Sequence, residues 1–241
     1  MRSIKNKIAW LTIFSIAMGF METAIVIYLR KMYYPSGFSF PLAAVAPDIA
    51  LIEFLREAAT IIMLISIGII AGKTASQKFA YFIYSFAIWD IFYYVFLKLL
   101  INWPVSFCTW DILFIIPVPW VGPVLAPCIL SITMILLSFV IVFYSEKGYT
   151  TKLNYKEWLL FIIGSLIILF SFTQDYFKII FMDSKNHIWT LASNKSLFNE
   201  MNNYIPGSYN WLLFIIGEIT ILVNIYLLIN RFKSKSFNKK S

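Results

Sequence analysis

The sequence has few charged residues. Asp, Glu, Lys and Arg make up only 13% of its 241 residues, whereas hydrophobic residues make up 60% and aromatic residues 19%. A soluble globular domain has roughly 25% charged residues. Apolar runs recur along the chain, and about 20 such residues are enough to cross the hydrocarbon core of a bilayer as a helix. The composition therefore excludes a soluble domain and predicts an integral membrane protein in contact with the lipid bilayer.

Residues and motifs that hold cofactors are also scarce. His187 is the single histidine, which excludes a bis-histidine haem, a histidine-rich copper or zinc site and a Ser-His-Asp triad. There is no Walker motif, no GxGxxG fingerprint and no ExxH pair of the diiron type. We expect no cofactor, and any metal would have to be a divalent cation held by oxygen ligands alone. The two cysteines, Cys108 and Cys128, are expected to stay unpaired.

The apolar runs predict an all-α integral membrane protein in a single domain, 1–241, built as a six-helix transmembrane bundle. The first run continues past Glu22 with no convincing cleavage site before it, so we interpret it as an uncleaved helix. A short amphipathic helix is expected near 194–203, and 231–241 is expected to form a basic tail. The predicted spans cover residues 8–29, 50–71, 79–101, 123–144, 157–175 and 209–230.

The basic residues indicate how the chain is oriented. With both termini in the cytoplasm, the cytoplasmic segments hold thirteen Lys and Arg residues and the outer segments hold six. This bias predicts a multi-pass protein of the cytoplasmic (inner) membrane with cytoplasmic N- and C-termini. The net charge of +8 fits helix ends that face anionic lipid headgroups, so we expect no nucleic acid partner.

One stretch, residues 89–127, breaks the helical pattern. It holds two Trp-Asp pairs, at 89–90 and 110–111, and Pro117, Pro119 and Pro123 forbid a regular helix near its end. Irregular backbone at membrane depth is tolerated only where it is buried in protein or lines a wet cavity. We therefore expect a proline-broken, re-entrant segment on the outer side, with a short half-helix at 112–116. This segment would roof a pocket with Trp103, Trp110, Asp111 and Trp120.

Several ionisable residues lie inside the predicted spans. A charge at the centre of a membrane helix costs about 2.5–3.5 kcal/mol, so these side chains are expected to face the interior of the bundle. Acids outnumber bases, and a desolvated carboxylate without a base takes up a proton or binds a cation. The sequence therefore predicts a carboxylate-rich pocket that faces outward. Its candidate residues are Glu22, Glu53, Arg56, Glu57, Asp90, Tyr94, Lys98 and Glu218.

Each of these residues also has a structural interpretation. Arg56 stands between Glu53 and Glu57 on one helix face and is explained well by an ion pair that locks the helix to its neighbours. Asp90 fits a structural hydrogen bond as well as a functional role. Asp111 fits the N-cap of the half-helix better than a catalytic acid. Glu218 is the hardest to explain structurally, because no base precedes it in its span.

Two motifs carry a resemblance to other proteins. The segments EFLREAATIIML and WDIFYYVFLKLLINWP, continued by TWDILFIIPVPWVGPVLAP, resemble a group of bacterial multi-span membrane proteins with no assigned activity. The resemblance covers Glu53 to Pro127. It implies a membrane fold and no particular activity, so no functional residue is transferred.

Three functions are compatible with the sequence. The first is binding or translocation of a small solute or cation with proton coupling, in which the acids handle protons. The second is a non-catalytic subunit of a larger membrane complex, whose buried charges fix helix register. The third is a membrane-embedded enzyme acting on a lipid-soluble substrate at the outer face, with Asp90 and Glu57 as acid and base. Whether the protein is an enzyme, and whether it forms a homo-oligomer or joins other subunits, stays open.

Overall fold

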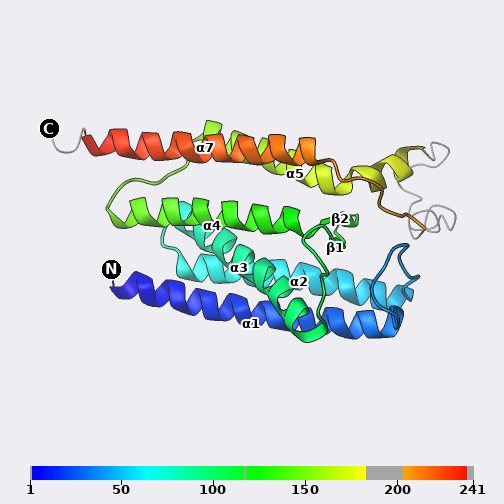
Figure 1. The fold of residues 1–241 in the computed structure, drawn as a ribbon. Helices are drawn as coiled ribbons and strands as arrows, with labels where there is room; N and C mark the ends of the chain where they lie inside the picture. The colour runs from blue at the N-terminus through cyan, green and yellow to red at the C-terminus, as the bar shows by residue number, and fades with distance from the viewer. Residues whose placement is uncertain (1, 117, 183–202, 238–241) are drawn as a thin grey trace.

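The structure is a computed structural model that describes residues 2–116, 118–182 and 203–237. Within these residues, six helices are long and apolar enough to cross a membrane, which confirms the predicted all-α bundle (Figure 1). The short helix expected near 194–203, His187 and the end of the basic tail lie outside the described residues. The helices are α1 (Arg2–Tyr33), α2 (Pro47–Ala71), α3 (Ala75–Ile101), α4 (Leu125–Glu146), α5 (Tyr155–Met182) and α7 (Trp211–Phe237). Helix α7 thus continues into the segment expected to be a tail.

Helix α3 is the centre of the bundle. It packs against α1 on one side, α2 on another and α4 on a third, while α5 and α7 pack against each other and α7 adjoins α4. Both termini lie at one end of the bundle, and the loop that follows α1 lies at the other end (Figure 1). This second end is called the hairpin end below, after the two strands that lie there.

Three glycines allow the neighbours of α3 to come close to it. A Cβ added at Gly19 of α1 would lie 3.0 Å from the carbonyl oxygen of Trp89. Gly68 of α2 and Gly72, the residue that caps the C-terminus of α2, face the first turns of α3, where added Cβ atoms would lie 2.8 Å and 2.4 Å from its backbone. Small residues at this spacing let membrane helices pack backbone to backbone. These contacts fix α1 and α2 on α3.

Helix α3 has defined signals at both ends. The side-chain oxygen of Thr74 accepts a hydrogen bond from the backbone N–H of Gln77, which caps the first turn. At the other end, Asn102 adopts a left-handed conformation with φ 54°, which stops the helix before Pro104. The chain then leaves α3 at the hairpin end.

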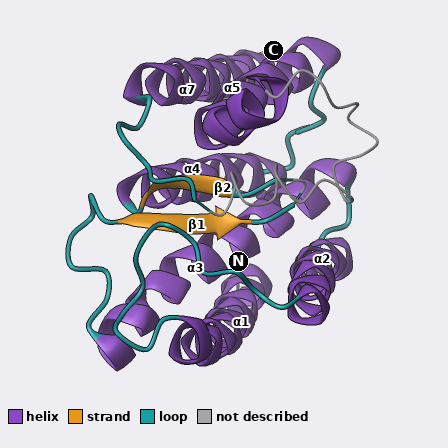
Figure 2. Cartoon of the chain, turned by 90° about the vertical axis from the view of Figure 1, so that its right-hand side faces the viewer, coloured by secondary structure: helices purple, strands orange, loops and turns teal. Residues whose placement is uncertain are grey.

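The proline-broken segment forms a β-hairpin. Strand β1 (Trp110–Phe114) pairs antiparallel with β2 (Trp120–Pro123), and the hairpin lies between the α5–α7 pair and α1 to α3 in the end-on view (Figure 2). The predicted half-helix at 112–116, with Asp111 as its N-cap, was wrong, because these residues belong to β1 and the connection that follows it. The two strands pair the backbone groups on their facing edges with each other, so the segment satisfies part of its backbone hydrogen bonds without a helix. Cys108 and Cys128 are both free.

The close contact of Gly68 with α3 generates a prediction about stability. In an open helix interior, Gly→Ala stabilises by about 1 kcal/mol. At Gly68 the new Cβ would lie 2.8 Å from the carbonyl oxygen of Lys78 and the backbone nitrogen of Phe82, and such overpacking costs about 1–3 kcal/mol. We expect Gly68→Ala to lower the Tm of the protein in detergent micelles. The control is Gly207→Ala, whose Cβ meets no atom within 4 Å. An unchanged or higher Tm for Gly68→Ala would contradict the close packing of α2 on α3.

Candidate functional site

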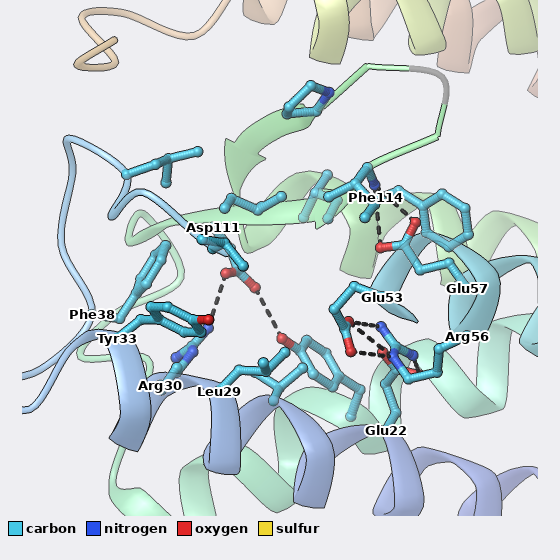
Figure 3. Close-up of a pocket in the computed structure, with 18 of the residues that line it drawn as sticks. Glu22, Leu29, Arg30, Tyr33, Phe38, Glu53, Arg56, Glu57, Asp111 and Phe114 are labelled. Atoms are coloured by element: carbon cyan, nitrogen blue, oxygen red, sulfur yellow. Dashed lines mark hydrogen bonds and ion pairs between the residues drawn. The ribbon is translucent and has the colours of Figure 1, made fainter. Parts of the chain in front are cut away.

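A cavity of about 370 Å³ lies toward the hairpin end of the bundle (Figure 3). Its walls come from α1, the loop 34–46, α2, α3, β1 and the residues after it, and α5. Most of the lining side chains are apolar or aromatic. The ionisable lining residues other than tyrosines are Glu22, Arg30, Glu53, Arg56, Glu57, Asp90 and Asp111. The hydrophobic and aromatic ones are Val26, Leu29, Tyr33, Tyr34, Phe38, Leu42, Ala43, Val45, Ala50, Trp89, Tyr93, Tyr94, Ile112, Leu113, Phe114, Ile115, Pro119 and Tyr176.

Arg56 joins α1 to α2 at one side of the cavity. Its Nε donates to both carboxylate oxygens of Glu53, at 3.0 and 2.9 Å, and its Nη2 donates to Glu53 Oε2 at 2.8 Å. Its Nη1 donates to Glu22 of α1. Both partners are partly buried, so the ion pairs are shielded from water. The i,i+3 spacing indicated the contact with Glu53, and the structure adds Glu22 from another helix.

Glu57 follows Arg56 in sequence, but its carboxylate contacts the hairpin segment. Its two carboxylate oxygens accept from the backbone N–H of Ile115, at 2.9 and 3.2 Å, just after β1 ends. The residue is only 7% exposed. This bond fixes the end of β1 to α2. Glu57 forms no ion pair among the described residues.

A second buried ion pair lies on the opposite side of the cavity (Figure 3). Arg30 Nη2 donates to Asp111 Oδ1 at 3.0 Å, and the hydroxyl of Tyr93 donates to Asp111 Oδ2 at 3.5 Å. The Arg30 guanidinium lies 3.7 Å from the ring centre of Trp103 and 4.6 Å from that of Phe38. Asp111 lies outside the spanning helices, where burial raises the pKa of its carboxyl and Arg30 acts in the opposite direction. Hydrogen bonds from the backbone of Ile112 and from Tyr94 and Tyr93 act on the pKa of Asp111 in the same direction as Arg30.

Arg30 was missed by the sequence analysis, which counted it only as a basic residue of an outer segment. A signal for it was present. Glu22, Val26, Arg30 and Tyr33 recur at spacings of three and four, so they share one face of α1, and all four line the cavity. The partner Asp111 is 81 positions away and was assigned to a half-helix, which hid the pairing.

Asp90 lies deeper in the bundle, between α3 and α4. One carboxylate oxygen accepts from the hydroxyl of Ser131 at 2.8 Å. Tyr94, one turn further along α3, is buried beside Tyr93 with ring centres 4.9 Å apart. Asp90 and Tyr94 both line the cavity. Asp90, like Glu57, has no basic partner among the described residues.

Two predicted residues lie away from the cavity. Lys98 is exposed, and its Nζ donates to the carbonyl oxygen of Pro104 at 3.1 Å. Glu218 is buried between α7 and α4, where it accepts from the Thr133 hydroxyl at 2.9 Å. The structure therefore brings six of the eight candidate residues to one cavity and leaves these two outside it.

Of the four residues predicted to roof the pocket, only one lines the cavity. Asp111 lines the cavity, whereas Trp103 covers it indirectly by stacking on Arg30. Trp110 and Trp120 pack toward the α5–α7 pair: Trp110 contacts Tyr209 at 6.1 Å between ring centres, and Trp120 is stacked with Phe172 at 6.5 Å. These two tryptophans attach the hairpin to the bundle and do not contact the cavity.

The charges that line the cavity are unbalanced. Five carboxyl groups face two guanidinium groups, and three of the carboxyls are paired: Glu22 and Glu53 with Arg56, and Asp111 with Arg30. Glu57 and Asp90 are left with neutral donors only. In the part of the chain that the structure describes, no three His, Cys, Asp or Glu side chains are grouped so that they could hold a metal ion.

No protein-family model, no curated protein and no solved structure matches the chain. The resemblance to a bacterial membrane protein group therefore stays an interpretation of the sequence, and the site has to be understood from its own geometry.

The Arg30–Asp111 pair gives a testable prediction. Removing one partner of a buried ion pair costs about 3–5 kcal/mol, because the other charge is left without compensation, whereas replacing both partners by apolar residues is often neutral. We expect Arg30→Met to lower the Tm in detergent strongly, and the double variant Arg30→Met/Asp111→Leu to recover part of the loss.

The matched control for this prediction is the exposed pair of Lys178 and Asp175 on α5. The Lys178 side chain is 63% exposed, and surface pairs contribute about 0–1 kcal/mol, so Lys178→Met should leave the Tm nearly unchanged. A double variant less stable than Arg30→Met alone would show that the ion pair is not the main interaction between these residues.

Proposed function

We propose that this chain is a membrane-embedded binding protein for a small solute, and that the solute occupies the cavity at the hairpin end. The observation that carries the proposal is a cavity lined by two carboxyl groups without a basic partner among the described residues. The other two hypotheses, a structural subunit and an enzyme, gain no specific observation from the described residues.

The size and lining of the cavity support a solute site. Small-molecule sites are concave, occupy about 300–1,000 Å³ and are lined mainly by apolar and aromatic side chains with a few polar groups that orient the ligand. The cavity has about 370 Å³ and this kind of lining. Its polar groups come from four different elements, so a ligand among them would be held from several sides.

Glu57 and Asp90 are the groups proposed to exchange protons or meet a positive charge. Glu22, Glu53 and Asp111 are engaged with arginines, and removing them from these pairs would leave buried guanidinium groups uncompensated. Glu57 and Asp90 accept only from a backbone N–H and a hydroxyl. Desolvated carboxyls in this situation take up a proton or bind a cation, which is the basis for proton coupling in the proposal.

The proposed orientation places the cavity on the outer side of the cytoplasmic membrane and both termini in the cytoplasm. It rests on the excess of basic residues in the segments at the end of the bundle where both chain termini lie. Translocation of the solute, as opposed to binding alone, would require a second conformation. In the described conformation, the N-terminal half of α3 packs in an apolar core that includes Ala80, Tyr81 and Leu11.

The orientation can be tested with C-terminal fusions in bacterial cells. One reporter is a fluorescent protein that matures only in the cytoplasm, and the other is a phosphatase active only in the periplasm. We expect fluorescence and no phosphatase activity from matched amounts of the two fusions. The opposite result would invert the proposed orientation and place the cavity on the cytoplasmic side.

Access to the cavity can be tested by cysteine labelling. In a background with Cys108→Ser and Cys128→Ser, we expect Val26→Cys to react with a membrane-impermeant maleimide added on the hairpin side, because Val26 lines the cavity. Reaction at Val26→Cys from both sides would extend the proposal from binding to translocation. If Val26→Cys reacts from neither side, the proposed solute site is wrong.

The labelling test has two controls. Phe107→Cys, at an exposed position of the hairpin end, should react from that side only. Thr150→Cys, at an exposed position in the loop between α4 and α5, should react only from the side where both chain termini lie. These controls define the two sides independently of the cavity.

A further inference from the structure

We infer that the ligand of the cavity is a small organic cation with an apolar body, such as an alkylammonium compound. The inference rests on the proposed function, since it names the class of solute that the same cavity would take. It is carried by the charge balance, the aromatic lining and the volume of the cavity.

The charge balance favours a positive ligand. The two guanidinium groups of the cavity are already engaged, Arg56 with Glu22 and Glu53, and Arg30 with Asp111. An anionic ligand could meet Arg30 Nη1, which is buried without a hydrogen-bond partner among the described residues, but it would add to the excess of negative charge in the cavity. A cation meets two carboxyls that have no basic partner, and its binding reduces the excess of negative charge in a desolvated site.

Aromatic side chains supply the second component of a cation site. Trp89, Tyr93, Tyr94 and Tyr176 line the cavity on the α3 and α5 sides. The face of an aromatic ring attracts a cation, most strongly where water is excluded, and quaternary ammonium ligands are recognised in this way. Asp90 lies on the same helix as three of these rings, so aromatic faces and a carboxyl occur together there.

The protein already holds one of its own organic cations by the same combination. The guanidinium of Arg30 lies over the rings of Trp103 and Phe38 and pairs with the carboxylate of Asp111. This arrangement shows that the folded chain stabilises a delocalised cation between aromatic rings and a carboxylate at this depth. The ligand would use the same chemistry at the unengaged carboxyls.

Three lining residues carry a buried polar atom without a hydrogen-bond partner among the described residues, and one of these atoms is Arg30 Nη1. The hydroxyl of Tyr176 and the indole Nε1 of Trp89 have no hydrogen-bond partner in the described part of the chain, and the two residues are only 1% and 5% exposed. Buried polar groups of this kind normally have a partner. Of these atoms, the Tyr176 hydroxyl can accept a hydrogen bond from an ammonium N–H.

The volume separates an organic cation from a bare metal ion. A metal ion needs several oxygen ligands at about 2.0–2.6 Å, and no group of three His, Cys, Asp or Glu side chains among the described residues could provide them. A cavity of about 370 Å³ with a largely apolar wall instead fits a charged head group attached to a hydrocarbon body.

The experiment compares three probes of nearly equal size with the full-length protein in detergent micelles. The probes are cyclohexylmethylammonium, cyclohexylmethanol and cyclohexanecarboxylate, and binding is measured by isothermal titration calorimetry against empty micelles. We expect the ammonium compound to bind at least about tenfold more tightly than the alcohol and the carboxylate, the size of effect that a desolvated cation–π contact and an ion pair supply together.

Variants assign the binding to the cavity. Glu57→Gln and Asp90→Asn should each weaken binding of the ammonium compound by about tenfold, since each removes a negative charge at nearly constant shape. Glu218→Gln is the matched control: it changes a buried carboxyl that lies outside the cavity, so it should leave binding unchanged. Val26→Trp, which fills the cavity, should abolish binding. The Tm of each variant shows whether it is folded, and if one is not, the order of the three probes on the natural protein decides.

The outcomes distinguish the ligand class from the proposed function. Tightest binding of the alcohol or the carboxylate, abolished by Val26→Trp, would overturn the organic cation and leave the solute site intact. Binding of the ammonium compound that is unaffected by both carboxyl variants would also overturn the ligand class. If no probe binds, or if Val26→Trp changes nothing, both the ligand class and the solute site are wrong.

Discussion

The structure depends on the need to neutralise charges that are placed inside membrane-spanning helices. A guanidinium or carboxylate at that depth is unfavourable unless another side chain compensates for it. Arg56 of α2 meets this need by contacting Glu53 on its own helix and Glu22 on α1. Helices α1 and α2 both pack on α3, and this ion pair network connects the two helices at one side of the cavity.

The β-hairpin meets the same need from outside the helices. Its backbone supplies the N–H of Ile115 to Glu57, and its strand β1 supplies Asp111 to Arg30. In each case a group on the hairpin compensates a charged or polar side chain on a helix. The cavity is therefore closed by an element whose position is fixed by electrostatic contacts with α1 and α2, in addition to the packing of its apolar side chains.

The sequence was sufficient for the helices and for part of the site. Each span follows from a run of apolar residues, and the contact between Glu53 and Arg56 follows from their spacing on one helix. The hairpin was not predicted, because three prolines exclude a helix without specifying how the strands pair. The Arg30–Asp111 pair joins residues 81 positions apart, and Glu218 turned toward α4 and away from the cavity. Contacts of this kind depend on how the helices are arranged, which a single sequence does not encode in a local pattern.

The stacking of Trp120 on Phe172 has a mechanical consequence. Helices α5 and α7 pack mainly on each other, and their contacts with the rest of the bundle include those of α7 with α4, of α5 with β2, and of Trp158 with Phe79 of α3. A sideways displacement of this helix pair would pull on the tryptophan and thus on the whole hairpin. Because the hairpin also carries Ile115 and Asp111, the same displacement would stretch the contacts of Glu57 and Arg30 at once. The position of the α5–α7 pair is therefore coupled, through the hairpin, to the wall of the cavity.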